Sequence, residues 1–96
     1  MAWGVVTANK EKADMMFDRF EREYKGHISW CVRSNKHHQM VLDTGKNLVW
    51  CNPYVQAKSQ RLYRVWVDKD LLKDKEILDS YCKHMIMCPR SEYDWI

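Results

Sequence analysis

The chain has 96 residues, with 16 Lys and Arg against 13 Asp and Glu, so its net charge is only +3. A chain of this length forms one domain with a modest core. The small charge excess does not indicate a dedicated nucleic-acid binder, because such proteins cluster positive charge on one face. The sequence shows neither a secretion signal nor an apolar run of membrane-spanning length. We therefore expect a cytoplasmic protein with no membrane partner, whose four Cys are reduced thiols.

The first third of the chain predicts a strand, a helix and a second strand. Residues 3–8 are apolar and β-branched, which is typical of a buried strand. Over residues 10–25 apolar side chains recur every three or four positions and form one helical stripe. Gly26 is well placed to end this helix, and residues 27–33 alternate as a strand does. The apolar face of that strand is expected to consist of Ile28, Trp30 and Val32.

The middle of the chain predicts a β-hairpin. Residues 39–43 and 47–52 are joined by Thr44-Gly45-Lys46, in which Gly supplies the positive φ that a hairpin turn requires. His37 and His38 stand at the turn before the hairpin, where we expect both to be exposed to solvent. Residues 54–60 fit either a short helical turn or a loop.

The last third predicts a strand over residues 62–67 and then a helix, whose start Asp68 or Asp70 can cap. Pro89 makes the residue before it the expected helix boundary. Residues 90–96 form a polar-aromatic tail that is either flexible or folded back onto the domain. The apolar stripe of the helix consists of Leu71, Leu78, Tyr81, Cys82 and Met85.

This order, β-α-β-β-β-α, predicts an α+β fold. Residues 1–96 form a single small domain in which two helices cover a mixed sheet. The first β-α-β unit is a candidate right-handed crossover between parallel strands, and the hairpin adds antiparallel strands.

Three phrases of the sequence resemble the ATPase domain of phage terminase large subunits. The phrase Val5-Val6-Thr7-Ala8-Asn9, with the helix after it, is similar to the strand and helix that open the family pattern. Residues 42–50 are similar to its hairpin with a turn glycine. Residues 64–68 are similar to the strand that ends in the Walker B motif. The resemblance spans residues 3–70 and implies descent from a nucleotide-hydrolysing domain.

Two departures from that family argue against ATP hydrolysis. The chain has no G-x-x-x-x-G-K-[ST] loop to hold phosphates, and Gly45-Lys46 lies in the hairpin turn. Lys69 stands where the family has its catalytic glutamate. Only Asp68 can be carried over by position, and we assign it no catalytic role.

Other chemistry finds weak support in the sequence. Asp68 and Asp70 could bind Mg²⁺ in a metal-dependent nuclease, but helix capping is the favoured interpretation. No nearby residue marks an activated thiol for a Cys–His nucleophile pair. We therefore predict no enzyme, no catalytic residue, no metal and no cofactor. Three residues could bind zinc, with His37 or His38 as a distant fourth ligand, but their spacing matches no standard zinc motif. They are Cys82, His84 and Cys88.

Five Trp and five Tyr are many for a core this small. Exposed Trp, Tyr and Arg are the usual anchors of protein interfaces, although these aromatics could instead bury against the sheet edges. We predict a small non-enzymatic binding protein of phage or mobile-element type. It would act by occupying a macromolecular partner, for example a host defence complex in the host cytoplasm. The candidate partner-binding residues are Trp3, Tyr54, Arg61, Arg64, Tyr93 and Trp95.

The alternative is a nucleic-acid- or nucleotide-binding module derived from a P-loop ATPase-like domain. Arg61, Tyr63, Arg64 and Trp66 interleave basic and aromatic side chains, as stacking platforms for single strands do. A homo-oligomer is compatible with either function.

Overall fold

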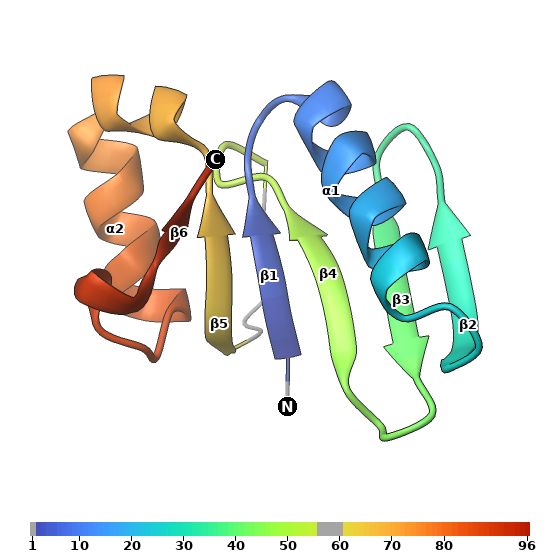
Figure 1. Cartoon of the computed structure of the whole chain (residues 1–96). Helices are drawn as coiled ribbons and strands as arrows, with labels where there is room; N and C mark the ends of the chain where they lie inside the picture. Colours follow the sequence, from blue (N-terminus) through green and yellow to red (C-terminus); the bar gives the residue numbers. More distant parts are fainter. Residues whose placement is uncertain (1, 56–60) are drawn as a thin grey trace.

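The computed structural model describes residues 2–55 and 61–96 and shows a six-stranded sheet with two α-helices (Figure 1). The predicted α+β domain with a mixed sheet and two helices is confirmed. Of the predicted turn or loop at 54–60, residues 56–60 lie outside the described residues. The elements in chain order are β1 (Ala2–Val6), α1 (Lys10–Glu23), β2 (Ile28–Arg33), β3 (His38–Leu42), β4 (Asn47–Cys51), β5 (Leu62–Val67), the 3₁₀ helix η1 (Lys69–Lys73), α2 (Lys75–Met85), the 3₁₀ helix η2 (Arg90–Glu92) and β6 (Asp94–Trp95).

The strands lie in the order β2-β3-β4-β1-β5-β6. β1 pairs in parallel with β4 and β5, and β5 pairs in parallel with β6. The hairpin strands β3 and β4 are antiparallel, as are β2 and β3. The strands of the first β-α-β unit, β1 and β2, run in the same direction, as predicted, and β3 and β4 lie between them in the sheet. The parallel neighbours of β1 come from much later in the chain.

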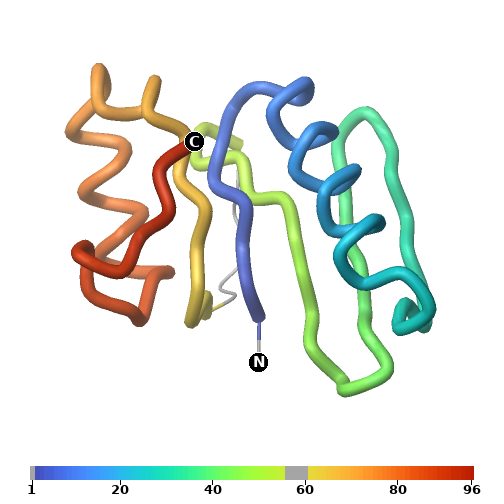
Figure 2. The backbone as a smooth tube through the Cα atoms, in the orientation of Figure 1, coloured from blue at the N-terminus to red at the C-terminus, as the bar shows by residue number. Residues whose placement is uncertain are grey.

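Each face of the sheet has its own core. Successive residues of a strand point to opposite faces, so Val5 packs under α1 while Val6 packs on the side of α2. Phe17 and Phe20 of α1 are buried against the sheet, which confirms the predicted apolar stripe of this helix. The two helices lie on opposite faces and toward opposite ends of the sheet (Figures 1 and 2). Neither α-helix has the length and apolarity that crossing a membrane requires.

The start of β2 contains an irregularity that overturns one prediction. The register with β3 shifts between Ile28 and Trp30, and such a bulge changes the face to which later residues point. Ile28 therefore packs under α1 together with Cys31. Trp30 points to the other face, where 51% of its surface is exposed. The expected apolar face of Ile28, Trp30 and Val32 is thus wrong.

The segment after β5 also differs from the prediction. Asp68 caps the short 3₁₀ helix η1 by accepting a hydrogen bond from the Asp70 amide at 2.9 Å. The long helix starts later, at Lys75, where Asp74 is the cap. Of the predicted stripe, only Leu71 lies outside α2; it is in η1 and still buried.

Residues 90–96 form η2 and β6 and extend the sheet beyond β5. The Ile96 amide donates to the Val67 carbonyl at 2.9 Å, and the Lys69 amide donates to the Ile96 carbonyl at 2.8 Å. These bonds show the segment folded back onto the domain, which is one of the two predicted alternatives.

Gly4 in β1 leaves room for Leu62 of β5, and we predict that Gly4→Ala destabilises the fold. The added Cβ would lie 2.6 Å from Leu62 Cδ1, and Leu62 is completely buried. We expect urea unfolding to show a loss of about 1–3 kcal/mol. In the Leu62→Val background the clashing methyl groups are gone, so the same change should cost less. Strictly additive losses would contradict this explanation.

Candidate functional site

The carboxyl ends of β1, β4, β5 and β6 meet at one edge of the sheet because these strands are parallel. The chain leaves β1 toward α1 on one face and leaves β5 toward α2 on the other (Figure 1). Open α/β sheets bind ligands in the crevice where neighbouring strands diverge in this way. In this chain Thr7 follows β1 and Asp68 follows β5, so these two residues occupy that position.

The Asp68 carboxylate is buried and has hydrogen-bond donors on both oxygens. The Thr7 hydroxyl donates to Oδ2 at 2.7 Å. On Oδ1, the Lys12 ammonium donates at 2.6 Å and the Asp70 amide at 2.9 Å. A divalent cation at this carboxylate would have to displace Lys12. The residue that the terminase resemblance aligns with Walker B is thus bound by groups of the chain itself.

Lys12 also contacts the chain just after β6. Its ammonium donates to the Ile96 carbonyl at 3.2 Å and lies 3.9 Å from the Asp70 carboxylate. The side chain of Lys12 is 24% exposed, against 4% for Asp68. The position at the carboxyl ends of β1 and β5 is therefore occupied by an internal ion pair, which the sequence did not predict.

The environment of Asp68 favours its ionised form. Burial by itself would raise the pKa of this carboxyl. The hydrogen bonds from Lys12, Thr7 and the Asp70 amide outweigh burial, so the pKa lies below its ordinary value. Asp68 consequently stays a carboxylate near neutral pH and shows no sign of a raised pKa that would suit a general acid.

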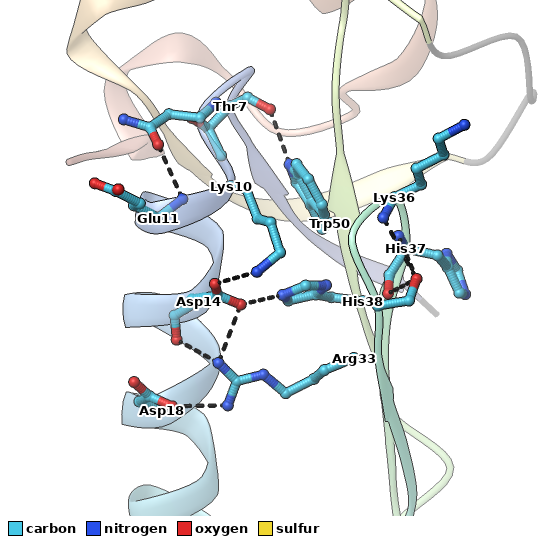
Figure 3. A network of polar contacts seen from close by, with 12 residues as sticks. Thr7, Lys10, Glu11, Asp14, Asp18, Arg33, Lys36, His37, His38 and Trp50 are labelled. Atoms are coloured by element: carbon cyan, nitrogen blue, oxygen red, sulfur yellow. Dashed lines mark hydrogen bonds and ion pairs between the residues drawn. The ribbon is translucent and has the colours of Figure 1, made fainter.

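A second polar network joins α1 to β2 and β3 (Figure 3). Asp14 accepts hydrogen bonds from Lys10 at 2.7 Å, from His38 at 2.5 Å and from Arg33 at 3.2 Å. The bond from Lys10, followed by that from His38, holds the pKa of Asp14 well below its ordinary range. Arg33 also donates to Asp18 at 2.7 Å. The network fastens the helix to the outer strands.

The prediction that both histidines face solvent is wrong for His38. Its side chain is completely buried, and its ring makes T-shaped contacts with the rings of Phe17 and Trp50. His37 is exposed and lies 3.2 Å from the side chain of Gln39. Burial of His38 follows from its place in β3 facing α1, and a sequence in which two His stand side by side does not reveal which one faces the helix.

The predicted soft metal ligands have other contacts. Cys82 and Cys88 pack against the core on the side of α2, while His84 is exposed. Arg90 lies 3.7 Å from the Cys82 thiol. Within residues 2–55 and 61–96, no three His, Cys, Asp or Glu side chains are grouped so as to hold a metal ion.

Two of the six predicted partner-binding residues come together on the part of the sheet that α1 leaves open. The Arg64 guanidinium lies 5.0 Å from the Trp3 ring and 4.7 Å from the Trp66 ring. Lys46 contributes a second cation 3.8 Å from Trp3. A cavity of about 300 Å³ opens beside this group. It is lined by Trp3, Tyr63, Arg64, Cys88 and Glu92.

The other four predicted residues lie elsewhere. Tyr54 is exposed and donates to Asp74 near the start of α2 at 3.1 Å. Arg61 is exposed just before β5. Tyr93 is buried at 9% exposure and packs against half-buried Trp95, so its side chain belongs to the core rather than to an open surface.

Comparison with known proteins finds no family model that matches the chain, and no curated protein or solved structure matches it either. Inference about function therefore rests on the residues of the chain itself.

We predict that Lys12→Met destabilises the protein far more than Lys10→Met, its matched control two residues earlier in α1. Without Lys12 the buried Asp68 carboxylate loses its counter-ion, and breaking such a pair costs about 3 kcal/mol or somewhat less at this partly exposed lysine. Lys10 is 43% exposed and pairs with Asp14 on the helix surface, so its loss should cost ~0.5 kcal/mol. Equal losses in urea unfolding would show that the internal ion pair is not stabilising.

We also predict that Asp68→Asn flattens the acid limb of the stability profile. A carboxyl whose folded pKa is depressed stabilises the fold above its unfolded pKa of about 4, and that contribution is lost as pH falls through the lower folded pKa. The wild-type protein should therefore lose stability more steeply than the variant below about pH 5. Asp14 keeps part of the slope in both proteins. Parallel profiles from pH-dependent denaturation would contradict the depressed pKa of Asp68.

Proposed function

We propose that this chain is a small non-enzymatic binding protein that acts by occupying a macromolecular partner, and that the partner is a protein. The observation that carries the proposal is the group of half-buried Trp3 with exposed Tyr63 and Arg64 around one cavity. Trp, Tyr and Arg are the residues in which protein interfaces concentrate binding energy. We refer to Trp3, Lys46, Tyr63 and Arg64 together as the Trp3 surface.

The charge around the Trp3 surface favours a protein over a nucleic acid. Lys46 and Arg64 are accompanied by Glu92 at the cavity and by Asp94, whose carboxylate lies 3.3 Å from Arg64. These two cations and two anions carry no net charge, so the group has no excess positive charge to attract a polyanion. A protein surface with charges of both signs can complement such a pattern.

The filled crevice at Asp68 supports a function without catalysis. Thr7, Lys12 and the Asp70 amide occupy the carboxylate at the place where open α/β sheets act on their ligands. Descent from a terminase-like ATPase would leave a degenerate site of this kind. With that descent, the chain is a protein of phage or mobile-element type, and its partner is a host protein such as a component of a defence complex.

The proposal is tested by affinity capture from the cells in which the chain is naturally expressed. Tyr63→Ala with Arg64→Ala removes exposed anchors, and Lys83→Ala with His84→Ala on the exposed side of α2 is the matched control. A protein retained by the wild-type chain and by the control should be lost from the first variant. With the purified partner, we expect the affinity to fall at least about tenfold.

Single-stranded DNA provides the opposing arm of this experiment. If the wild-type chain binds DNA with an affinity that falls steeply with salt, and captures no protein that depends on Tyr63 and Arg64, then the nucleic-acid-binding alternative is correct. Circular dichroism should show equal folding of all variants before binding is compared.

A further inference from the structure

The outer edge of β2 is a second surface, at which a strand of a partner could pair with the sheet. β2 is an edge strand of the sheet, and among residues 2–55 and 61–96 no strand pairs with its outer side (Figure 1). An edge of this kind presents unpaired amide and carbonyl groups, and proteins commonly guard it with charged side chains. The one charged residue of β2 is Arg33. Its guanidinium is turned onto α1, where it donates to Asp18 at 2.7 Å, so it does not guard the edge.

The hydrogen-bond pattern identifies which backbone groups are free. The Ser34 amide donates to the His37 carbonyl at 2.8 Å, which makes this a hydrogen-bonded pair of the β2–β3 ladder. Hydrogen-bonded and non-hydrogen-bonded pairs alternate along an antiparallel ladder. The pairs of Arg33 with His38 and Cys31 with Met40 are therefore non-hydrogen-bonded. It follows that the amides and carbonyls of Cys31 and Arg33 point away from β3, toward solvent.

The two sides of this edge differ in chemistry. On the side of α1, the carboxylates of Asp18 and Glu21 are 54% and 44% exposed and share the single guanidinium of Arg33. On the opposite side stand Trp30, which is 51% exposed, and half-buried Val32. A strand added to β2 would thus have acidic groups on one face and apolar groups on the other.

We infer that the outer edge of β2 binds an extended segment of a partner protein in which basic and apolar residues alternate. Successive side chains of a strand point to opposite faces, so the basic ones meet Asp18 and Glu21 while the apolar ones meet Trp30 and Val32. The backbone of the segment pairs with Cys31 and Arg33, which is recognition by strand addition. A second copy of this chain fits less well, because antiparallel pairing of two β2 strands would bring the two acidic rows toward each other. This surface is independent of the Trp3 surface.

The experiment uses a capped peptide of alternating Lys and Val with the six-residue length of β2. Titration into the isotopically labelled full chain should shift amide resonances of β2 and α1, and should leave those of the Trp3 surface unchanged. A peptide of alternating Glu and Val tests charge, and the Lys-Val peptide with alternate amides N-methylated tests backbone pairing. Both should bind at least about tenfold more weakly.

Variants of the chain locate the binding edge. Cys31→Pro removes a backbone N–H that points to solvent and places the proline ring on the unpaired side of β2. An edge strand tolerates Pro at such a position. Cys31→Ala is the control. Asp18→Asn with Glu21→Gln removes the acidic row without touching the backbone, and Glu76→Gln on exposed α2 is its control. Each test variant should weaken Lys-Val binding about tenfold while each control binds normally.

Three results would overturn the inference. The Lys-Val peptide could fail to shift β2 resonances, or it could bind both test variants as well as it binds the wild type. The chain alone could also scatter light as a dimer that Cys31→Pro converts to a monomer, in which case a second copy occupies the edge. If Cys31→Pro does not fold, the acidic-row variant and the N-methylated peptide decide the outcome.

Discussion

The buried carboxylate of Asp68 is the constraint on which the arrangement of the chain depends. It lies where β1, α1, η1 and β6 converge, and it receives hydrogen bonds from Thr7, Lys12 and the Asp70 amide. A buried charge costs several kcal/mol unless it is paired and hydrogen-bonded, so these elements can take up only positions that supply those donors. Lys12 extends the constraint to the last strand through the Ile96 carbonyl. Residues that are far apart in the chain are thereby held at one edge of the sheet.

The same constraint separates the place where ligands usually bind from the places where this chain has surface to offer. The crevice at the strand ends is occupied by the internal ion pair. The helices lie on opposite faces and toward opposite ends of the sheet (Figure 2). Each face is therefore covered over one part and open over another. Trp3 and Arg64 lie on one open part and Trp30 on the other, which explains how a domain this small leaves several large aromatic side chains accessible.

The sequence predicted those parts of the fold that depend on local pattern. The helix over 10–25, the hairpin and its turn glycine, and the strand over 62–67 follow from periodicity and turn chemistry, and the structure confirms them. The bulge in β2 was missed because one extra residue leaves no compositional trace. The two-residue strand β6 was missed because it is too short to show alternation.

The sequence also failed to predict most polar contacts between residues that are far apart in the chain. Thr7 and Asp68 each end a predicted strand, so their meeting could have been expected once the strands were taken as parallel. For Lys12, in contrast, the sequence pattern indicates only one of many charged residues on the outer side of a helix. Only the three-dimensional position of the first helical turn, beside the carboxyl edge, assigns it to Asp68. The pairing of His38 with Asp14 depends in the same way on how α1 crosses the outer strands.

The position of β1 has a consequence for how the protein folds. This strand lies in the middle of the sheet, yet its neighbours come from later segments: Ala2 pairs with Asn47 on one side and with Leu62 on the other. During synthesis β1 is made before β4 and β5, so its apolar side chains cannot be buried against those strands until they have followed. Folding that depends on such distant parallel pairings is slow, and the waiting strand is exposed to aggregation meanwhile. The interval between the synthesis of β1 and that of β5 is thus the one in which this strand lacks the partners that would bury it.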